Sequence, residues 1–256
     1  MSGQTGPLLS ALITIRNEQK QLADCLDRLA FVDEIVIVLD KCTDGSRDIA
    51  ARYTDRLIEG DWPKEGPRRN AGIAACRGQW IFEIDADERV PTALADEIVA
   101  LIGSSSDDWH EILVDNYIGG KLVRWGWGAS FGKAAYPGLF RNGVKKWGDQ
   151  RVHPSLQWSG RKGPMLKHRL DHYVDRDLSG LIRKLDSYST ARAQDLREAG
   201  ETWGSTASNI RRFFSRFIKC YFFRKGYREG GYGLAIALLA GLYPLLSHLK
   251  AKLESD

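Results

Sequence analysis

Four carboxylates end a run of strand-forming residues in "QWIFEIDADERV", residues 79–90: Glu83, Asp85, Asp87 and Glu88. In an extended chain Asp85 and Asp87 point to the same side, because side-chain direction alternates from residue to residue. Like charges held that close are unfavourable unless a cation or hydrogen-bond donors lie between them. Carboxylate oxygens suit Mg²⁺ or Mn²⁺, which also bind phosphate oxygens. The pattern therefore indicates a divalent metal bridging a diphosphate, with a solvated charged turn as the alternative.

Other phosphate-binding signatures are missing from the sequence. It contains no G-x-x-x-x-G-K-[ST] motif, and no G-x-G-x-x-G motif follows the first expected strand. Metal together with Arg or Lys side chains is the remaining way to hold phosphate groups.

Strands and helices alternate along the first 118 residues and must position the acidic cluster. Hydrophobic patterns and Pro or Gly boundaries predict strands at 8–15, 33–40, 55–60, 79–88 and 110–118, and helices at 18–30, 45–55, 66–78 and 91–103. Such alternation predicts an α/β fold with a parallel sheet and right-handed crossovers. Ligands bind beyond the carboxyl ends of such strands. We therefore expect Asp40 and the acidic cluster to face a ligand crevice rather than the core.

The chain changes character after residue 117. Residues 117–165 are rich in Gly, Trp and basic residues, which predicts long loops and short antiparallel strands forming one wall of a pocket. Aromatic faces there suit sugars, although packing is the alternative for any single Trp. Residues 178–200 predict an amphipathic helix.

The C-terminal segment mixes basic and aromatic residues. Residues 211–228 hold seven Arg/Lys and seven Phe/Tyr, a mixture suited to the headgroups of an anionic membrane. The apolar stretch 231–247 is shorter than the roughly 20 residues needed to span a bilayer. We expect an interfacial helix hairpin; burial against the rest of the chain or against a dimer partner is the alternative.

Composition excludes several classes of protein. A net charge of +4 on 256 residues is too small to argue for a nucleic-acid partner. Four widely spaced cysteines, none in a C-x-x-C pair, indicate neither a disulfide framework nor a zinc site, and favour a reducing, cytosolic setting.

His168 and His172 have the helical spacing of zinc ligands but lack an H-E-x-x-H signature. The apolar N-terminus is interpreted as a strand rather than a signal peptide.

Several stretches together resemble a known enzyme family: "ALITIRNEQKQLADCLDRL", "DEIVIVLDKCTDGSRDIA" and "RRNAGIAACRGQWIFEIDADERV". They look like a family 2 glycosyltransferase with the GT-A fold. The resemblance continues through "RNGVKKWGDQRVHPSL" and "LDHYVDRDLSGLIRKLDSYST" into the branch that adds β-linked glucose to the inner core of bacterial lipopolysaccharide. It implies a Rossmann-like GT-A catalytic domain at 1–175, with a nucleotide-sugar half at about 1–116 and an acceptor half at about 117–175. A helical, membrane-associating extension at 176–256 follows.

The resemblance also implies roles for individual residues. Asp40 would hydrogen-bond uracil, Asp85 would contact the ribose or a metal-bound water, and Asp87 would bind Mg²⁺ or Mn²⁺. The other residues expected near the nucleotide or diphosphate are Thr14, Asn17, Glu18, Arg69 and Asn70.

The implied reaction is an inverting transfer of a hexose, with UDP-glucose as the favoured nucleotide-sugar donor. The implied acceptor is a lipid-linked saccharide such as lipopolysaccharide core. The enzyme would then lie peripherally on the cytoplasmic face of the bacterial inner membrane, against an anionic surface and without a nucleic-acid partner.

The sequence departs from the family pattern in two places. Asp40 is followed by Lys-Cys-Thr-Asp (41–44) instead of Ser-Gly-Ser-Thr-Asp, and Pro154 stands where the branch has Glu after Val-His. Inversion needs a general base for the acceptor hydroxyl. Asp149 and His153 are the candidates, with Asp149 preferred and a simple turn residue as the alternative for it.

Three other functions compete with this one. A non-catalytic nucleotide-sugar or lipid-binding protein fits the loss of the expected Glu, and a nucleotidyltransferase could share the fold. The basic-aromatic tail could also bind nucleic acid, but that function leaves Asp85 and Asp87 unexplained.

Overall fold

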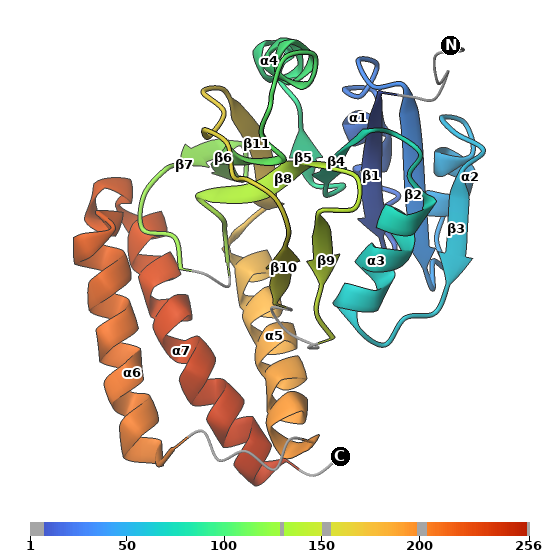
Figure 1. Ribbon diagram of the computed structural model, residues 1–256. Coiled ribbons are helices and arrows are strands. Elements are labelled where there is room, and N and C mark those ends of the chain that lie inside the picture. Colours follow the sequence, from blue (N-terminus) through green and yellow to red (C-terminus); the bar gives the residue numbers. More distant parts are fainter. Residues whose placement is uncertain (1–7, 129–130, 150–154, 199–203, 255–256) are drawn as a thin grey trace, which may run out of the picture. The chain divides into compact units, whose positions relative to one another are not determined.

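The computed structural model describes residues 8–128, 131–149, 155–198 and 204–254 (Figure 1). It divides into two compact units. The first unit comprises Met1–Val114 and Ala135–His172, and the second, helical unit comprises Asp115–Ala134 and Tyr173–Asp256. Within the described residues, the strands form a nine-stranded sheet in the order β3-β2-β1-β4-β8-β6-β11-β5, with β7 on β6, and a separate pair β10-β9.

The parallel half of the sheet lies in the first unit. Each neighbouring pair in the order β3-β2-β1-β4 runs parallel, as the alternating pattern predicted. The strands are β1 (Leu9–Ile15), β2 (Glu34–Asp40), β3 (Leu57–Gly60) and β4 (Trp80–Ile84). The connecting helices are α1 (Leu22–Leu26), α2 (Ser46–Ala50), α3 (Glu65–Ala75) and, after β4, α4 (Thr92–Ile102). The predicted α/β class is confirmed.

Helices α1 and α2 are shorter than expected, with five residues each. After α1 the chain continues in turns, in which Arg28 N donates to Cys25 O and Leu29 N to Leu26 O. These bonds span three residues instead of four, so the α-helix ends although the apolar spacing persists.

Antiparallel strands complete the sheet. β8 (Ala135–Arg141) lies between β4 and β6 (Trp109–Ile118) and is antiparallel to both. The remaining strands are β5 (Glu88–Arg89), β7 (Lys121–Val123), β9 (Lys145–Trp147), β10 (Leu156–Trp158) and β11 (Arg169–Asp175). The short antiparallel strands predicted for 117–165 are therefore present, whereas His172 lies on a strand and not on the helix its spacing suggested.

Buried strands give the first unit its core. All seven residues of β1 are buried, because helices and loops cover both faces of a parallel sheet. Leu12 packs with Val36, Val38 and Ile81 on one face, while the other face contributes to a larger cluster. That cluster includes Ala11, Ile13, Ile37, Leu94, Ile98 and Leu139.

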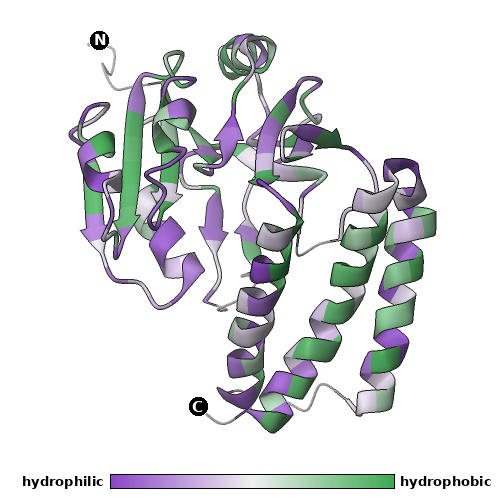
Figure 2. Cartoon of the chain, turned by 180° about the vertical axis from the view of Figure 1, so that it is seen from behind, coloured by the Kyte–Doolittle hydropathy of each residue, from purple (hydrophilic) through white to green (hydrophobic). Residues whose placement is uncertain are grey.

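Three long helices form most of the helical unit: α5 (Leu178–Glu198), α6 (Thr206–Ile218) and α7 (Gly231–Leu253). α6 continues into a π-helical turn, η1 (Lys219–Phe223), and a 3₁₀ turn, η2 (Gly226–Glu229), precedes α7. Gly230, with φ of 57°, supplies the left-handed residue at which the chain reverses. α7 lies between α5 and α6, and Figure 2 shows it mostly hydrophobic along its length. The predicted C-terminal helical segment is confirmed.

Candidate active site

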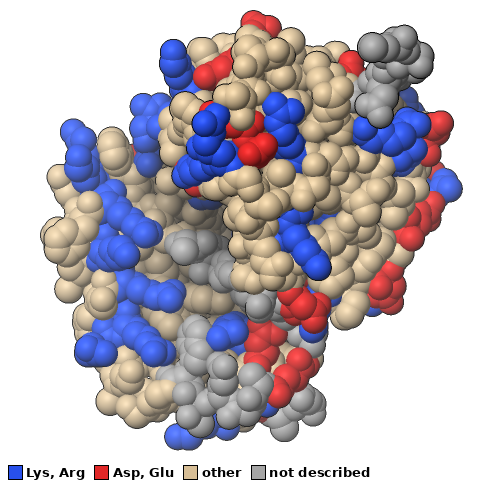
Figure 3. Space-filling model, in the orientation of Figure 1, with Lys and Arg blue, Asp and Glu red and all other residues tan. Residues whose placement is uncertain are grey.

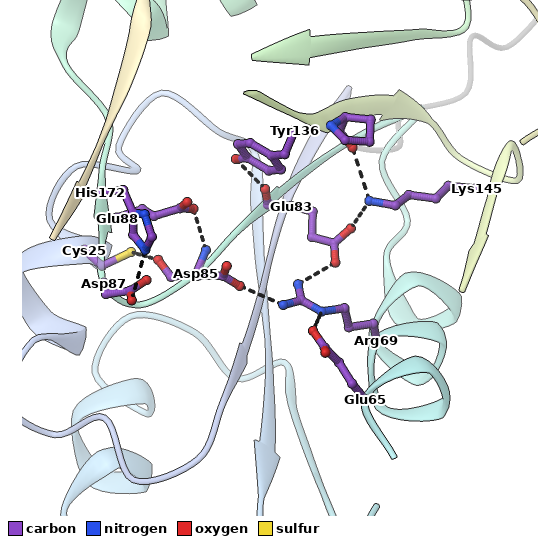
Figure 4. Close-up of polar contacts among 11 residues, drawn as sticks. Cys25, Glu65, Arg69, Glu83, Asp85, Asp87, Glu88, Tyr136, Lys145 and His172 are labelled. Carbon is purple, nitrogen blue, oxygen red and sulfur yellow. Dashed lines mark hydrogen bonds and ion pairs between the residues drawn. The ribbon is translucent and has the colours of Figure 1, made fainter. Parts of the chain in front are cut away.

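The acidic segment forms a tight turn at the carboxyl end of β4. Glu88 N donates to Asp85 O at 3.0 Å, so residues 85–88 reverse direction and the chain enters β5. The expectation of an extended chain with Asp85 and Asp87 on one side is therefore wrong. The turn points Asp85 toward α3 and Asp87 toward β11 (Figure 4).

Arg69 of α3 holds Asp85. Its Nη2 lies 3.0 Å from Asp85 Oδ1, while Nη1 and Nε lie 2.7 Å from Glu83 Oε1 and Glu65 Oε1. Burial would lower the pKa of Arg69, but the charges of Asp85, Glu83 and Glu65 outweigh it and raise that pKa well above its usual value. A permanently charged guanidinium therefore fixes the Asp85 carboxylate (Figure 4).

Glu83 and Glu88 do not face a crevice, which corrects the expectation for the acidic cluster. Both are buried, at 2% and 0% exposure. Lys145 of β9, itself buried, donates to Glu83 Oε2 at 2.5 Å and to Pro137 O at 3.1 Å. Glu88 Oε2 accepts from Asp85 N at 2.9 Å. Glu83 is thus a buried charge that is paired and hydrogen-bonded, which makes its burial tolerable, while Glu88 stabilises the turn through its bond from Asp85 N.

Asp87 lies beside His172. Antiparallel pairing places His172 opposite Glu88, and its Nε2 is 3.3 Å from Asp87 Oδ2. The two side chains are in direct polar contact, and a carboxylate with an adjacent imidazole is a donor set that could hold a divalent ion such as Mn²⁺. Within the described ranges, no group of three or more His, Cys, Asp or Glu could hold a metal. Asp87 and His172 would therefore be the protein ligands of such an ion, which would need further ligands from its substrate or from water.

Asp40 ends β2 at the same sheet edge and is buried. Its Oδ1 accepts from Trp62 N at 3.0 Å, and its Oδ2 pairs with Arg68 Nη1 at 3.1 Å. A carboxylate offers about four acceptor positions, so two partners leave capacity for a further donor. Thr14, on neighbouring β1, has a buried hydroxyl without a hydrogen-bond partner among the described residues.

Asn17 and Glu18 join the loop after β1 to the loop after β2. Asn17 has a φ of 60°, a conformation that Asn tolerates, and its Oδ1 accepts from Thr43 N at 2.7 Å. Glu18 N donates to Ser46 Oγ at 2.8 Å. Residues 41–44, which differ from the family pattern, thus take part in joining the two loops.

Asn70 holds β9 against α3. Its Nδ2 donates to Trp147 O at 2.8 Å, and its Oδ1 accepts from Trp147 N at 2.9 Å. Asp149 follows two residues later, is largely exposed and pairs with Lys64 Nζ at 2.7 Å. His153, the other proposed base, lies outside the described residues.

Two residues of the candidate site carry little signal in the sequence. His172 stands out there only by its spacing from His168, which pairs instead with Glu97 at 2.9 Å. Lys145 was one of many basic residues in the segment 117–165. Only the pairing of β5 with β11, and the packing of β9 on α3, bring these side chains to the acidic turn.

The glycosyl transferase family 2 model matches residues 10–152, more than half of the chain. The chain belongs to this family. The match begins in β1 and includes the acidic turn, α3 and β9, so the residues that gather around Asp85 all lie within it.

Curated relatives extend the similarity over most of the chain. The lipopolysaccharide core biosynthesis glycosyltransferase LpsC of Rhizobium meliloti is 26% identical over 262 residues, covering 94% of this chain and 91% of the relative. An uncharacterized glycosyltransferase of Rickettsia felis is 26% identical over 231 residues, covering 84% and 80%. The chain is therefore a family 2 glycosyltransferase with relatives of similar length.

Solved structures are also similar. S. aureus TarS 1-349 in complex with UDP matches with a TM-score of 0.49 at 12% identity, covering 96% of this chain and 91% of that chain. Glucosyl-3-phosphoglycerate synthase from Mycobacterium tuberculosis, in complex with Mn²⁺ and UDP-glucose, matches with a TM-score of 0.36 at 18% identity, covering 45% of each chain.

Proposed function

We propose that this glycosyltransferase moves a hexose, with glucose favoured, from a UDP-sugar to a lipid-linked glycan such as lipopolysaccharide core, with inversion at the transferred carbon. The observation that carries the proposal is the Asp87–His172 pair, 3.3 Å apart, next to the Arg69-held Asp85 at the carboxyl edge of the parallel strands. The description of LpsC as a lipopolysaccharide core enzyme supports the choice of acceptor.

Asp87 and His172 would hold Mg²⁺ or Mn²⁺. When bound, the ion neutralises negative charge on the leaving diphosphate as a Lewis acid. Asp85 is paired with Arg69, so it could join His172 as a metal ligand only if that pair broke. We therefore assign Asp85 the role of accepting a hydrogen bond from a ribose hydroxyl or a bound water.

The nucleoside would occupy the edge formed by β1 and β2. Asp40 retains acceptor positions for the N–H of uracil, and the Thr14 hydroxyl is a buried group in need of a partner. Leaving a buried polar group unpaired costs roughly 1–3 kcal/mol, so a ligand that bonds to Thr14 recovers part of that free energy.

Asp149 is the proposed base. As the acceptor oxygen attacks the sugar carbon, one Asp149 carboxylate oxygen would take the hydroxyl proton. Lys64 binds the carboxylate at Oδ2, which orients it but leaves lone pairs for the acceptor. In this scheme Asn70 is a positioning residue, because it ties Trp147 and thereby the segment leading to Asp149 onto α3.

A lipid-linked acceptor places the enzyme at a membrane. We propose that the chain lies peripherally on the cytoplasmic face of the inner membrane and contacts its anionic surface with the basic-aromatic residues 211–228.

The test is a panel of nucleotide-sugars with and without Mn²⁺, measuring thermal shift and slow UDP release. We expect a metal-dependent thermal shift with one UDP-sugar. We also expect Asp149→Asn to lower slow UDP release at least tenfold. For full transfer to the acceptor, the loss of a general base lowers the rate by about 100-fold or more. A shift without release would favour the non-catalytic binding protein. No shift with any nucleotide would refute the proposal.

The metal ligands have their own test. Asp87→Ala and His172→Ala should each weaken Mn²⁺-dependent UDP binding at least tenfold in calorimetric titrations, because each removes one of two protein ligands. His168→Ala is the matched control, since that histidine pairs with Glu97 instead. If both site variants bind UDP with Mn²⁺ as tightly as the wild type, the metal assignment is wrong.

A further inference from the structure

We propose that α6 and η1 lie flat on an anionic bilayer, and that the more apolar helix α7 is an internal core helix instead of a membrane span. The inference deepens the membrane contact proposed above for residues 211–228 and rests on that part of the proposed function, but it does not require the proposed sugar transfer. It identifies the residues that enter the lipid and the residues that contact the headgroups.

One face of α6 and η1 carries a row of exposed apolar side chains. Ile210, Phe214, Ile218 and Phe222 follow one another at four-residue spacing and are 45%, 56%, 43% and 56% exposed, and Phe223 is 79% exposed. We call these five residues the apolar row. Residues four apart share one face of a helix, so the row is continuous over about four turns.

A neighbouring face of the same helix already supplies the contact with α7, since each of its residues comes one position before a member of the apolar row. Phe213, Phe217 and Tyr221 stack in sequence, with ring centroids 6.5 and 5.5 Å apart, and Phe217 and Tyr221 pack against the core of the helical unit. A helix that packs on one neighbour needs a single apolar stripe. The apolar row is a second stripe, which packing among the described residues of this unit leaves largely exposed.

Basic residues flank the apolar row. Residues 206–229 contain seven Arg/Lys and one acidic residue, Glu229, so the segment carries a formal charge of +6, from 7 − 1. Glu229 is also occupied, because its Oε1 accepts from the backbone N–H groups of Arg124 and Trp125. Arg211 and Lys219 are exposed one position beyond Ile210 and Ile218. In Figure 3, Lys and Arg side chains gather over this part of the helical unit.

Helix α7 is long and apolar enough to cross a membrane, but half of its most apolar 18-residue stretch is buried within the chain. Ile236, Ala237, Ala240 and Tyr243 pack in the core of the helical unit. On the α6 side, Gly241 allows close approach, since a Cβ there would lie 2.8 Å from the Phe213 ring. Placing α7 across a bilayer would remove the core of this unit.

An anionic bilayer matches this surface better than other partners. A second copy would bring two +6 segments together, which is electrostatically unfavourable. A nucleic acid would satisfy the charge but would leave the isoleucines of the apolar row in water. Interfacial helices combine an apolar face with flanking Lys and Arg, as found here.

The experiment is co-sedimentation of the full-length chain with vesicles of phosphatidylcholine alone or with one-third phosphatidylglycerol. We expect strong binding only to the anionic vesicles. Phe214→Glu/Phe222→Glu should reduce partitioning at least tenfold, and Arg211→Glu/Lys219→Glu should reduce it more than about tenfold, at roughly fivefold per basic residue. Val99→Glu is the matched control, because Val99 is 47% exposed on α4 in the first unit.

Circular dichroism and donor hydrolysis without vesicles accompany each variant. Retained hydrolysis with lost vesicle binding supports the surface independently of the proposed reaction. Wild-type binding by both double variants would overturn it. A dimer in light scattering that Phe214→Glu/Phe222→Glu converts to monomer, or tRNA binding without vesicle binding, would overturn it in favour of a second copy or a nucleic acid.

Discussion

At the scale of single residues, the candidate site depends on charges that are buried in pairs. Arg69 of α3 and Lys145 of β9 both pair with Glu83 of β4 next to the acidic turn. Burial would raise the pKa of Glu83, but Lys145 and Arg69 outweigh it and hold that pKa below its ordinary value. Removing one member leaves an uncompensated buried charge, which is more costly than never having had the pair.

Lys145→Met should therefore destabilise the fold by about 3–5 kcal/mol, because Glu83 loses one of its two cationic partners. Urea unfolding measures the change. Lys146→Met is the control, since Lys146 is exposed on the same strand. Equal free energies of unfolding for the two variants would show that Lys145 does not stabilise Glu83.

Glu34 gives the fold a pH dependence. Burial would raise its pKa, but hydrogen bonds from Ser10 and Arg77, followed by the charge of Arg56, lower the pKa below its ordinary 4.5. A lowered folded-state pKa contributes stability above the unfolded value, and this contribution disappears as the pH falls through the folded value. Glu34→Gln should therefore destabilise the chain at pH 7 and progressively less below pH 4.5.

Urea unfolding of wild type and Glu34→Gln between pH 7 and pH 3 tests this expectation. Glu59→Gln serves for comparison, because the Glu59–Arg47 pair is exposed on both sides and exposed pairs contribute little. A Glu34→Gln deficit that stays constant across this pH range would contradict the assignment.

Residue types alone predicted part of the site. The acidic run located the segment of the candidate site, although an extended chain was expected where a turn is found, and Asp40 lies at the sheet edge where it was expected. The different environments of the four carboxylates were not predictable. Glu83 pairs with a lysine 62 positions later, and Asp87 contacts a histidine 85 positions later. Such partners depend on tertiary packing, about which local patterns carry no information.

At the scale of elements, hydrophobic periodicity predicted the order of strands and helices up to β6, except that the single strand expected at 79–88 is divided into β4 and β5. Parallel strands with intervening helices have strong local signals, and each expected strand in this range is present. The insertion of β8 between β4 and β6 was not predictable, since a seven-residue strand after a long irregular segment does not specify its neighbours. The same insertion brings β9 near α3.

The contact between α3 and the segment after β9 should be sensitive to a single methyl group. A Cβ at Gly66 would lie 1.7 Å from Gly148 O, so Gly66→Ala must push this segment, and Asp149 next to it, away from α3. We expect glycosyl transfer to fall at least tenfold while UDP binding changes less. Gly103→Ala is the control, because its nearest atoms would be 3.8 Å away. Unchanged transfer would mean that Asp149 need not be held there.

At the scale of the whole molecule, charge is distributed unevenly. The chain carries +4, whereas residues 206–229 alone carry +6, so all other residues together sum to −2, from 4 − 6. Binding to anionic vesicles should therefore weaken strongly between 50 and 500 mM salt, as the screening length shrinks below about 10 Å. A residual, salt-resistant fraction should remain from the apolar row. Complete loss of binding at 500 mM would show that the row does not enter the lipid.

The late position of Lys145 in the chain has a consequence for folding order. The strands β1 to β4 are complete by residue 84, yet Glu83 has no lysine partner until β9 is added. Between these two points the chain contributes residues 115–134 to the other unit. During synthesis β4 is therefore the edge strand of the parallel half, and its Glu83 lacks Lys145 until a segment about 60 residues downstream has been made. Pairings across such sequence separations form slowly.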